Sequence, residues 1–213
     1  MVFTRAIQYK KNISSKLLEQ TARQLEASPI PVRWILVDDG FQTEKDLKLI
    51  SFQTNQEKFP QGWEPLMKHK SPKLKWMGLW NCYYGLWNGI HPKHQLDAQT
   101  ARGLVTTSKG KILPGDGPGG AGAFYGPFLQ SVKNAGFDFV KIDVQAEYLK
   151  HTDGLDNPVH HNTKCSEALE QACRKTGLSL MNCMAQGTVN IQNTRYSAIT
   201  RCSIDYKLGD EAM

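Results

Sequence analysis

The segment FVKIDVQ, residues 139–145, places one base and one acid inside a strand-like run of apolar residues. Phenylalanine, valine and isoleucine are typical of buried strands, yet Lys141 and Asp143 stand among them. Residues two apart on a strand face the same side, so Lys141 is expected to hold Asp143 ionised and to lower its pKa. An ionised carboxylate at the end of a strand is a candidate nucleophile. The alternative, a buried ion pair without a chemical role, is costly and uncommon.

Asp205, in the segment RCSID, offers a second carboxylate for acid–base chemistry. Arg201 and Asp205 flank the end of a predicted strand that is expected to lie two positions from the strand of Asp143. Strands lie about 4.8 Å apart, so these two ends are about 10 Å apart. Inward-reaching side chains can close to about 5–5.5 Å, the separation of the two carboxyl groups in a retaining glycosidase. Alternatively, Asp205 is a surface acid in a turn, paired with Lys207.

Polar residues collect at the carboxyl ends of the clear predicted strands. They are Asp38 and Asp39, Trp80 and Asn81, Lys141 and Asp143, Asn182 and Cys183, and Arg201 and Asp205. In a β/α barrel or a doubly wound sheet, this edge is where ligands bind. One acid alone, such as Asp39, can instead be the N-cap of a helix. The agreement of five strand ends favours a binding site.

Aromatic residues crowd the segment WNCYYGLWNG, residues 80–89, directly after a predicted strand. A sugar site needs aromatic surfaces and hydrogen-bonding acids, and Asp38 and Asp39 can each accept from a pair of sugar hydroxyls. The four aromatic residues are Trp80, Tyr83, Tyr84 and Trp87. Such clusters more often belong to a core, but the neighbouring asparagines and glycines favour a loop at the edge of a site.

Short apolar runs alternate with amphipathic segments along the chain. The predicted strands are 32–37, 73–80, 137–144, 178–184 and 196–204, with a sixth near 2–7. The predicted helices are 15–26 behind Ser14-Ser15, 127–135 with Pro127 in its first turn and Gly136 at its end, and 163–176 between an Asn162 or Thr163 cap and Gly177. Repeated β/α units indicate an α/β fold with a parallel sheet, either a barrel or a doubly wound sheet.

Composition excludes several classes of protein. The chain of 213 residues has a net charge of +6, but its basic residues are scattered, which favours a solvated surface over a nucleic-acid face. No run of about 18 apolar residues predicts a membrane span. The N-terminus lacks the apolar region of a signal peptide, so a cytoplasmic location is slightly favoured. The five cysteines form no C-x-x-C pair and are expected to be mostly buried, reduced thiols.

Two further patterns give little support to a cofactor or a metal ion. Gly115, Gly117 and Gly120 match the dinucleotide spacing, but Pro118 interrupts it and no solid strand precedes it. His151, Asp153 and the pair 160–161 fit no common metal site and are expected to be solvated loop residues. Residues 81–123 are expected to form a long functional loop. We therefore expect no cofactor and no metal.

The motifs ILVDDGFQ, FPQGW, GLWNGIHP, FVKIDVQ and TRCSIDY together resemble the catalytic barrel of glycoside hydrolase family 36. Within that family, the resemblance is to the raffinose synthase, seed imbibition protein and alkaline α-galactosidase group. It runs from about residue 3 to the end of the chain, with the motifs in the family's order. The resemblance implies a (β/α)8 TIM-type barrel, of which 213 residues provide about six of eight units. Residues 1–213 are then expected to be a partial catalytic barrel domain, without the family's flanking β domains.

The resemblance also implies a role for each candidate residue. Asp143 corresponds to the nucleophile and Asp205 to the acid/base, while Asp38 and Asp39 correspond to ligands of the galactose 4- and 6-hydroxyls. Lining the same subsite are Trp80, Lys141, Cys183 and Arg201. Two departures stand out: S-D-D-F reads Ser203-Ile204-Asp205-Tyr206, with one acid of two, and C-T-W reads Phe3-Thr4-Arg5, without the tryptophan.

The expected function is that of a retaining glycosidase or galactosyltransferase acting on raffinose-type oligosaccharides with a terminal α-galactose. Both activities pass through a galactosyl-enzyme intermediate, and the sequence leaves open whether water or a sugar hydroxyl enters second. The alternative is a non-catalytic carbohydrate-binding protein or pseudoenzyme on the same barrel. Neither a nucleic acid nor a membrane is expected as a partner, and the oligomeric state is left open.

Overall fold

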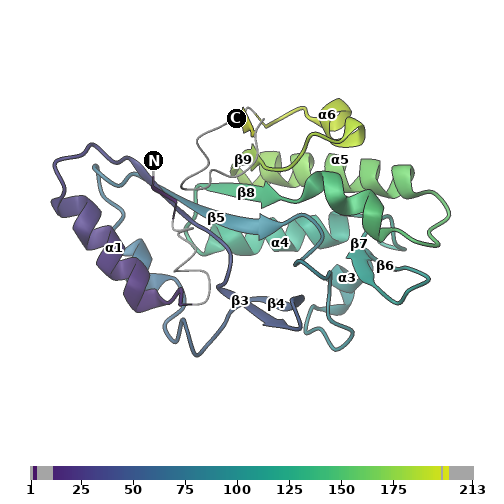
Figure 1. Cartoon of the computed structure of the whole chain (residues 1–213), viewed down its shortest axis with the longest axis horizontal. Coiled ribbons are helices and arrows are strands. Elements are labelled where there is room, and N and C mark those ends of the chain that lie inside the picture. Colours follow the sequence, from purple (N-terminus) through teal and green to yellow (C-terminus); the bar gives the residue numbers. More distant parts are fainter. Residues whose placement is uncertain (1, 4–11, 198, 202–213) are drawn as a thin grey trace, which may run out of the picture.

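Six parallel strands form the central sheet of the computed structural model, which describes residues 2–3, 12–197 and 199–201 (Figure 1). In sheet order the strands are β1 Val2–Phe3, β2 Trp34–Val37, β5 Trp76–Cys82, β8 Phe139–Asp143, β9 Ser179–Asn182 and β10 Ile199–Thr200. Each strand pairs with the next strand of this sheet along the chain. The reversal of order that marks a doubly wound sheet is absent among these described strands. The expected α/β fold with a parallel sheet is confirmed.

All six predicted strand regions contain a strand of this sheet. β5 continues two residues beyond its predicted range and includes Asn81 and Cys82. Residues 4–7 of the first predicted strand, and 198 and 202–204 of the last, lie outside the described residues. Runs of β-branched and aromatic residues in a parallel sheet are buried on both faces, which is why they were recognisable without alternation.

Helices connect the strands and cover the sheet. The longer ones are α1 Ser15–Ala27, α4 Gly122–Asn134 and α5 Pro158–Thr176, and the short ones are α2 Glu64–Met67, α3 Ala98–Ala101, η1 Gln145–His151 and α6 Thr188–Asn193. α4 and α5 pack against each other beside the sheet (Figure 1). α1 begins at Ser15 as predicted, and Ser14 caps it by accepting a hydrogen bond from the backbone N–H of Leu17 at 3.3 Å.

The start of α5 was wrongly predicted. The helix begins at Pro158, a residue favoured in the first turn, and Asn157 caps it by accepting from the backbone N–H of His160 at 3.0 Å. Asn162 therefore lies inside the helix, where its side-chain oxygen accepts from the Tyr83 hydroxyl at 3.0 Å. At the other end, Gly177 adopts a left-handed φ of 68° and stops the helix as predicted.

The start of α4 was also wrongly predicted. The helix begins at Gly122, so Pro127 lies inside it rather than in its first turn. The added turns carry Phe124 and Tyr125, both fully buried, and the Tyr125 hydroxyl donates to the backbone oxygen of Tyr83 at 2.7 Å. Burial of these two rings outweighs the low helix propensity of glycine and the hydrogen bond that proline cannot make.

Two antiparallel hairpins were not predicted. β3 Gln42–Lys45 pairs with β4 Lys48–Thr54, and β6 Leu104–Thr106 pairs with β7 Ile112–Pro114. The second hairpin lies in residues 81–123, so the long loop expected there is in fact folded, and it stands at the side toward which the β5 and β8 arrows point (Figure 1). In the first hairpin Asp46 and Leu47 both have positive φ, 57° and 59°, as a tight two-residue turn requires.

The core lies between the sheet and its helices. Strand residues such as Val37, Leu79 and Val140 are at most 3% exposed. The four cysteines among the described residues, Cys82, Cys165, Cys173 and Cys183, are buried and free of disulfides, as predicted. In the described part of the chain, no helix combines the length and the apolar character needed to cross a membrane.

Candidate active site

The register of the parallel strands places the predicted site residues side by side across the sheet. Trp80 of β5 pairs with Lys141 of β8, and Cys82 pairs with Asp143 one row further on. Asp38 follows directly after β2, whose last residue pairs with Leu79. Because neighbouring residues of parallel strands in one row face the same side, these side chains meet on one face at the carboxyl ends of the strands.

Lys141 bridges two buried carboxylates. Its Nζ atom donates to Oδ2 of Asp38 at 2.9 Å and lies 3.8 Å from Oδ2 of Asp143. All three residues are 5% exposed or less. The predicted arrangement of Lys141 and Asp143 on one face is present, but the carboxylate in closer contact with the lysine belongs to Asp38, which the strand pattern did not indicate. A buried ammonium group shared in this way keeps both acids from being uncompensated charges.

Asp143 is surrounded by hydrogen-bond donors. The Trp80 indole Nε1 donates to Oδ2 at 2.9 Å, and the backbone N–H of Val144 donates to Oδ1 at 2.8 Å. Burial alone would raise the pKa of this carboxyl, but the Cys183 and Trp80 hydrogen bonds, the Lys141 charge and the Val144 N–H together hold the pKa below its ordinary value. The predicted direction is confirmed, and Asp143 is ionised at neutral pH.

The backbone after Asp143 is strained. Val144 has a φ of 58°, in the left-handed region that a β-branched residue rarely adopts. The N–H of the same residue donates to Oδ1 of Asp143 at 2.8 Å. Strain of this kind collects where a structure orients a functional group, so it marks the end of β8 as a site in its own right.

Asp39 is held by a second tryptophan. The Trp87 indole donates to Oδ2 of Asp39 at 2.7 Å, and the Trp87 ring stacks on Trp80 with centroids 5.6 Å apart. Asp39 and Trp87 are partly exposed, whereas Asp38 and Trp80 are buried. No described helix begins at Asp39, since the chain runs on into β3, so the alternative role of a helix N-cap is wrong.

The aromatic segment is mostly core rather than an exposed platform. Tyr83 and Tyr84 are at most 2% exposed, and the Tyr83 hydroxyl contacts Asn162 and Ser166 of α5. The expectation of a loop of four ligand-facing aromatics is therefore corrected. Trp80 acts on Asp143 through its indole N–H, and Trp87 is the partly exposed ring of the set.

Cys183 and Arg201 complete the cluster from the neighbouring strands. The backbone N–H of Cys183 donates to the Ile142 oxygen at 2.9 Å, and that of Arg201 donates to the Asn182 oxygen at 3.1 Å. Burial, with the hydrogen bond to Asp143 and its charge, raises the pKa of the Cys183 thiol to about 12, so the thiol remains a donor. Lys141 and Arg201 act in the opposite sense on that thiol, so both cations lie near it.

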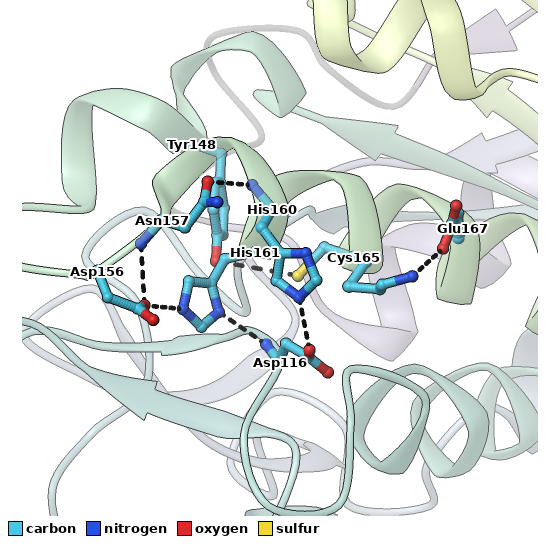
Figure 2. Close-up of polar contacts among 9 residues, drawn as sticks. Asp116, Tyr148, Asp156, Asn157, His160, His161, Cys165 and Glu167 are labelled. Atoms are coloured by element: carbon cyan, nitrogen blue, oxygen red, sulfur yellow. Dashed lines mark hydrogen bonds and ion pairs between the residues drawn. The ribbon is translucent and has the colours of Figure 1, made fainter.

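The remaining candidates fall into two groups. Asp205 and Lys207 lie outside the described residues. His160 and His161 belong to α5 rather than to a solvated loop, as Figure 2 shows: His160 pairs with Asp116 at 2.8 Å and His161 with Asp156 at 3.1 Å. His161 is only 7% exposed, so its assignment as a solvated residue is corrected. Within the described ranges, no three His, Cys, Asp or Glu side chains are grouped to hold a metal ion.

The aspartate–histidine contacts have a structural role. Nδ1 of His161 accepts from the backbone N–H of Asp116 at 3.0 Å, while its Nε2 donates to Asp156. These bonds fix the glycine-rich segment between β7 and α4 against the start of α5. The glycine spacing that resembled a dinucleotide motif therefore belongs to a tightly packed turn, where an added Cβ on Gly117 would lie 2.5 Å from the Leu104 oxygen.

The chain is similar to a curated protein and to several solved structures. No protein-family model matches the chain. A protein of Arabidopsis thaliana named probable galactinol–sucrose galactosyltransferase 6 is 23% identical over 245 residues, covering 93% of this chain. The chain spans 31% of the length of that curated relative.

Solved structures of α-galactosidases share the fold. The galactosidase domain of the α-galactosidase–sucrose kinase AgaSK has a TM-score of 0.64 at 15% identity, covering 91% of this chain and 28% of its own. A glycoside hydrolase family 36 α-galactosidase from Geobacillus stearothermophilus has a TM-score of 0.58 at 13% identity, covering 89% of this chain and 28% of its own. The resemblance to family 36 drawn from the sequence motifs is thereby confirmed.

Proposed function

We propose that this chain is part of the catalytic domain of a retaining α-galactosidase or galactosyltransferase of glycoside hydrolase family 36. Its natural substrates would be raffinose-type oligosaccharides with a terminal α-galactose. One observation carries the proposal: Asp143, buried and ionised at the end of β8, is held by Trp80, Lys141 and the Val144 N–H in a cluster that also contains Asp38. A carboxylate so fixed is suited to attack an electrophilic carbon.

The proposed architecture is a (β/α)8 barrel to which residues 1–213 contribute about six units. The consecutive order of the parallel strands supports it, as does the likeness to α-galactosidase domains. In such a barrel the face that carries Asp143 and Lys141 looks into the centre, and chemistry occurs at the carboxyl ends of the strands. The flanking β domains of the family would lie outside this chain.

The first half of the reaction forms a covalent intermediate. A carboxylate oxygen of Asp143 attacks the anomeric carbon of the α-galactoside while Asp205 gives its proton to the glycosidic oxygen, and the bond to the leaving group breaks. The product is a β-linked galactosyl ester of Asp143. The hydrogen bonds to Asp143 hold the nucleophile ionised and stabilise it again as a leaving group in the second half.

In the second half, Asp205 removes a proton from water or from a sugar hydroxyl. That oxygen attacks the anomeric carbon, the ester bond breaks, and Asp143 leaves as a carboxylate. Two inversions give overall retention. Water yields hydrolysis, and a sugar hydroxyl yields a longer oligosaccharide, so one site supports both activities.

The other cluster residues would bind the galactose. Asp38 and Asp39, directly after β2, would accept hydrogen bonds from the 4- and 6-hydroxyls. Lys141 lies between Asp38 and Asp143, so it can donate to a sugar hydroxyl while it compensates both carboxylates. Trp80, Cys183 and Arg201 would line the same subsite.

Substrates of the relatives support this class of ligand. A yeast α-galactosidase with a TM-score of 0.55 to this chain is solved with raffinose, and the Geobacillus enzyme with stachyose. Both ligands end in an α-galactose. A non-catalytic sugar-binding role is the second candidate, favoured by the sequence Ser203-Ile204-Asp205-Tyr206, which has one acid where the family pattern has two.

The test is turnover of 4-nitrophenyl α-galactoside by the full-length protein with azide rescue. Asp143→Ala should abolish turnover, and added azide should restore it with β-galactosyl azide as product, because azide enters where the carboxylate attacked. Asp205→Ala should give α-galactosyl azide, because azide then opens the galactosyl ester. Asp153→Asn, which changes an exposed acid paired with Lys109, is the matched control and should keep full activity.

Two results would contradict the proposal. Wild-type turnover by Asp143→Ala would exclude Asp143 as the nucleophile. An inactive but folded parent protein that binds galactosides would establish the non-catalytic alternative.

A further inference from the structure

Glu170 of α5 is a buried carboxylate that binds the segment before β10. It is 7% exposed. Its Oε2 atom accepts from the backbone N–H groups of Arg195 at 3.1 Å, of Tyr196, and of Ser197 at 3.0 Å. Its Oε1 atom accepts from the Ser197 hydroxyl at 2.6 Å. Consecutive backbone N–H groups that converge on one anion form a strong, geometrically defined contact.

The contact continues across the sheet as a chain of buried amides. The Ser197 hydroxyl oxygen accepts from the Asn182 amide at 2.7 Å, and the Asn182 oxygen accepts from the Gln145 amide at 2.8 Å. Gln145 also donates to the backbone oxygen of Ile142, the residue before Asp143, at 3.1 Å. Gln145 and Asn182 are at most 3% exposed. The chain therefore links α5, the start of β10, the end of β9 and the turn after the proposed nucleophile.

This network lies on the side of the sheet opposite the galactose site. Asn182 of β9 pairs in register with Ile142 of β8, so the two side chains face the same side of the sheet. Ile142 lies between Lys141 and Asp143 in β8, and its side chain therefore points away from theirs. None of the network groups can therefore touch a sugar bound at Asp143. Any effect on the reaction must pass through the backbone of β8 and β10.

β10 is a short strand that follows directly after the segment bound by Glu170. It is a strand of two residues, Ile199–Thr200, both exposed, and it pairs with β9. The residue that follows is Arg201, whose charge lies near Cys183. The hydrogen bonds of Arg195, Tyr196 and Ser197 to Glu170 lie directly before this strand, so they help to set where it enters the sheet.

We propose that Glu170 is a positioning residue of the galactosyl site. Through Ser197 it fixes β10 and the position of Arg201, which precedes the proposed acid/base Asp205 by four residues in the sequence. This inference rests on the proposed function. Placement matters because a shift of about 1 Å at a reacting group can cost about 100-fold in rate.

The experiment uses the full-length protein and two α-galactosides that differ in their need for an acid. A 2,4-dinitrophenyl leaving group departs without protonation, whereas raffinose requires it. Glu170→Gln keeps the shape of the side chain but replaces one accepting oxygen by an NH₂ group. We expect kcat/KM for raffinose to fall about tenfold or more, within the contribution of a general acid, and that for the dinitrophenyl substrate to change less than about threefold.

Two further variants make the result decisive. Glu167→Gln changes an exposed carboxylate on the same helix, paired with Lys164 at 3.0 Å, and should leave both values unchanged. Ser197→Ala removes one contact of Glu170 and should give the same pattern as Glu170→Gln with a smaller amplitude. If Glu170→Gln does not fold, Ser197→Ala alone tests whether the Glu170 contact positions the galactosyl site.

The outcomes separate this inference from the proposed function. Equal losses on both substrates, with a lower melting temperature, would make Glu170 a purely structural residue and overturn the inference. No loss on either substrate would overturn it as well. Wild-type turnover by Asp143→Ala in the same assay would instead overturn the proposed function, whatever Glu170→Gln does.

Discussion

The two ends of the inner face of the sheet differ in chemistry although the same strands build both. At the carboxyl end, this face carries Asp38, Lys141 and Asp143 in contact with one another. At the amino end, two to four residues earlier on the same strands, it carries a cavity of about 310 Å³. That cavity is lined by Trp34, Trp76, Asp138, Phe139, Ser179, Leu180, Met181 and Ile199.

The amino end is built by ring packing. Trp34 and Phe139 meet edge to face with centroids 5.4 Å apart. Gly78 lies between them in the sheet, and a Cβ added to it would be 2.1 Å from the Phe139 ring. The glycine thus lets a ring lie across β5. If the sheet belongs to the proposed barrel, we expect the amino ends of the strands to serve stability and the carboxyl ends to serve the chemistry.

The largest expected effect comes from removing the shared cation at the carboxyl end. Lys141→Met leaves Asp38 and Asp143 buried without their ammonium group, which should destabilise the protein by about 3–5 kcal/mol. Loss of the positive charge also raises the pKa of Asp143, so the acid limb of kcat/KM should move to higher pH. Denaturant unfolding and a pH–rate profile measure the two effects.

The control for this variant is Lys133→Met, at an exposed position of α4. It should change neither quantity. An unchanged acid limb in folded Lys141→Met would show that the lysine does not lower the pKa of Asp143. The charged cluster at the carboxyl end would then not have the electrostatic role assigned to it.

A smaller effect is expected at the amino end. Gly78→Ala forces the Phe139 ring to move and should destabilise the protein by about 1–3 kcal/mol, as overpacking does. The kcat of the folded variant should stay within about twofold of the parent, because in the proposed barrel the added methyl group lies at the end of the strands away from Asp143. Thermal unfolding and turnover at a low temperature separate the two.

Gly126→Ala is the matched control for Gly78→Ala. In α4, no atom lies within 4 Å of the added Cβ, so alanine should stabilise the protein by about 0.5–1 kcal/mol. A loss of kcat well beyond twofold in folded Gly78→Ala would mean that the amino end takes part in the chemistry, and the division between the two ends would be wrong.

The smallest expected effect concerns one hydrogen bond to Asp143. Cys183→Ala removes the thiol donor and should raise the pKa of Asp143, moving the acid limb of kcat/KM upward by less than about one pH unit. Cys183→Ser keeps a donor and should leave the limb in place. An equal shift in both variants would assign the effect to repacking rather than to the hydrogen bond.

The lowered pKa of Asp143 also makes the folding stability of the protein depend on pH. Because the pKa of Asp143 is lower in the folded protein than in the unfolded chain, the unfolded chain takes up the proton first. The stabilisation is therefore present above a pH of about 4 and is lost as the pH falls through the folded pKa.

The strands were predictable because buried runs of β-branched residues are distinctive in a parallel sheet. Helix starts were less so: Asn157 and Asn162 are both acceptable caps, and contacts of Asn162 with Tyr83, far along the chain, decide between them. The first hairpin escaped notice because its turn is formed by Asp46 and Leu47, without the glycine that usually identifies such a turn.

The site was predicted only in part. A period of two was enough to place Lys141 and Asp143 on one face. It could not indicate that Lys141 would bond to Asp38, 103 positions earlier, because that contact depends on the register of β2, β5 and β8. The burial of Tyr83 was likewise not predictable, because it depends on the contacts that α4 and α5 make with this residue.

The sequence by itself determined which segments enter the sheet, which face carries the charged pair and the family that the motifs resemble, because these depend on local periodicity and residue type. The tertiary structure alone decided how the pair is compensated, which indole reaches which acid, and that Glu170 binds the segment before β10. These are contacts between segments far apart in the chain, and their geometry exists only once the strands are in register.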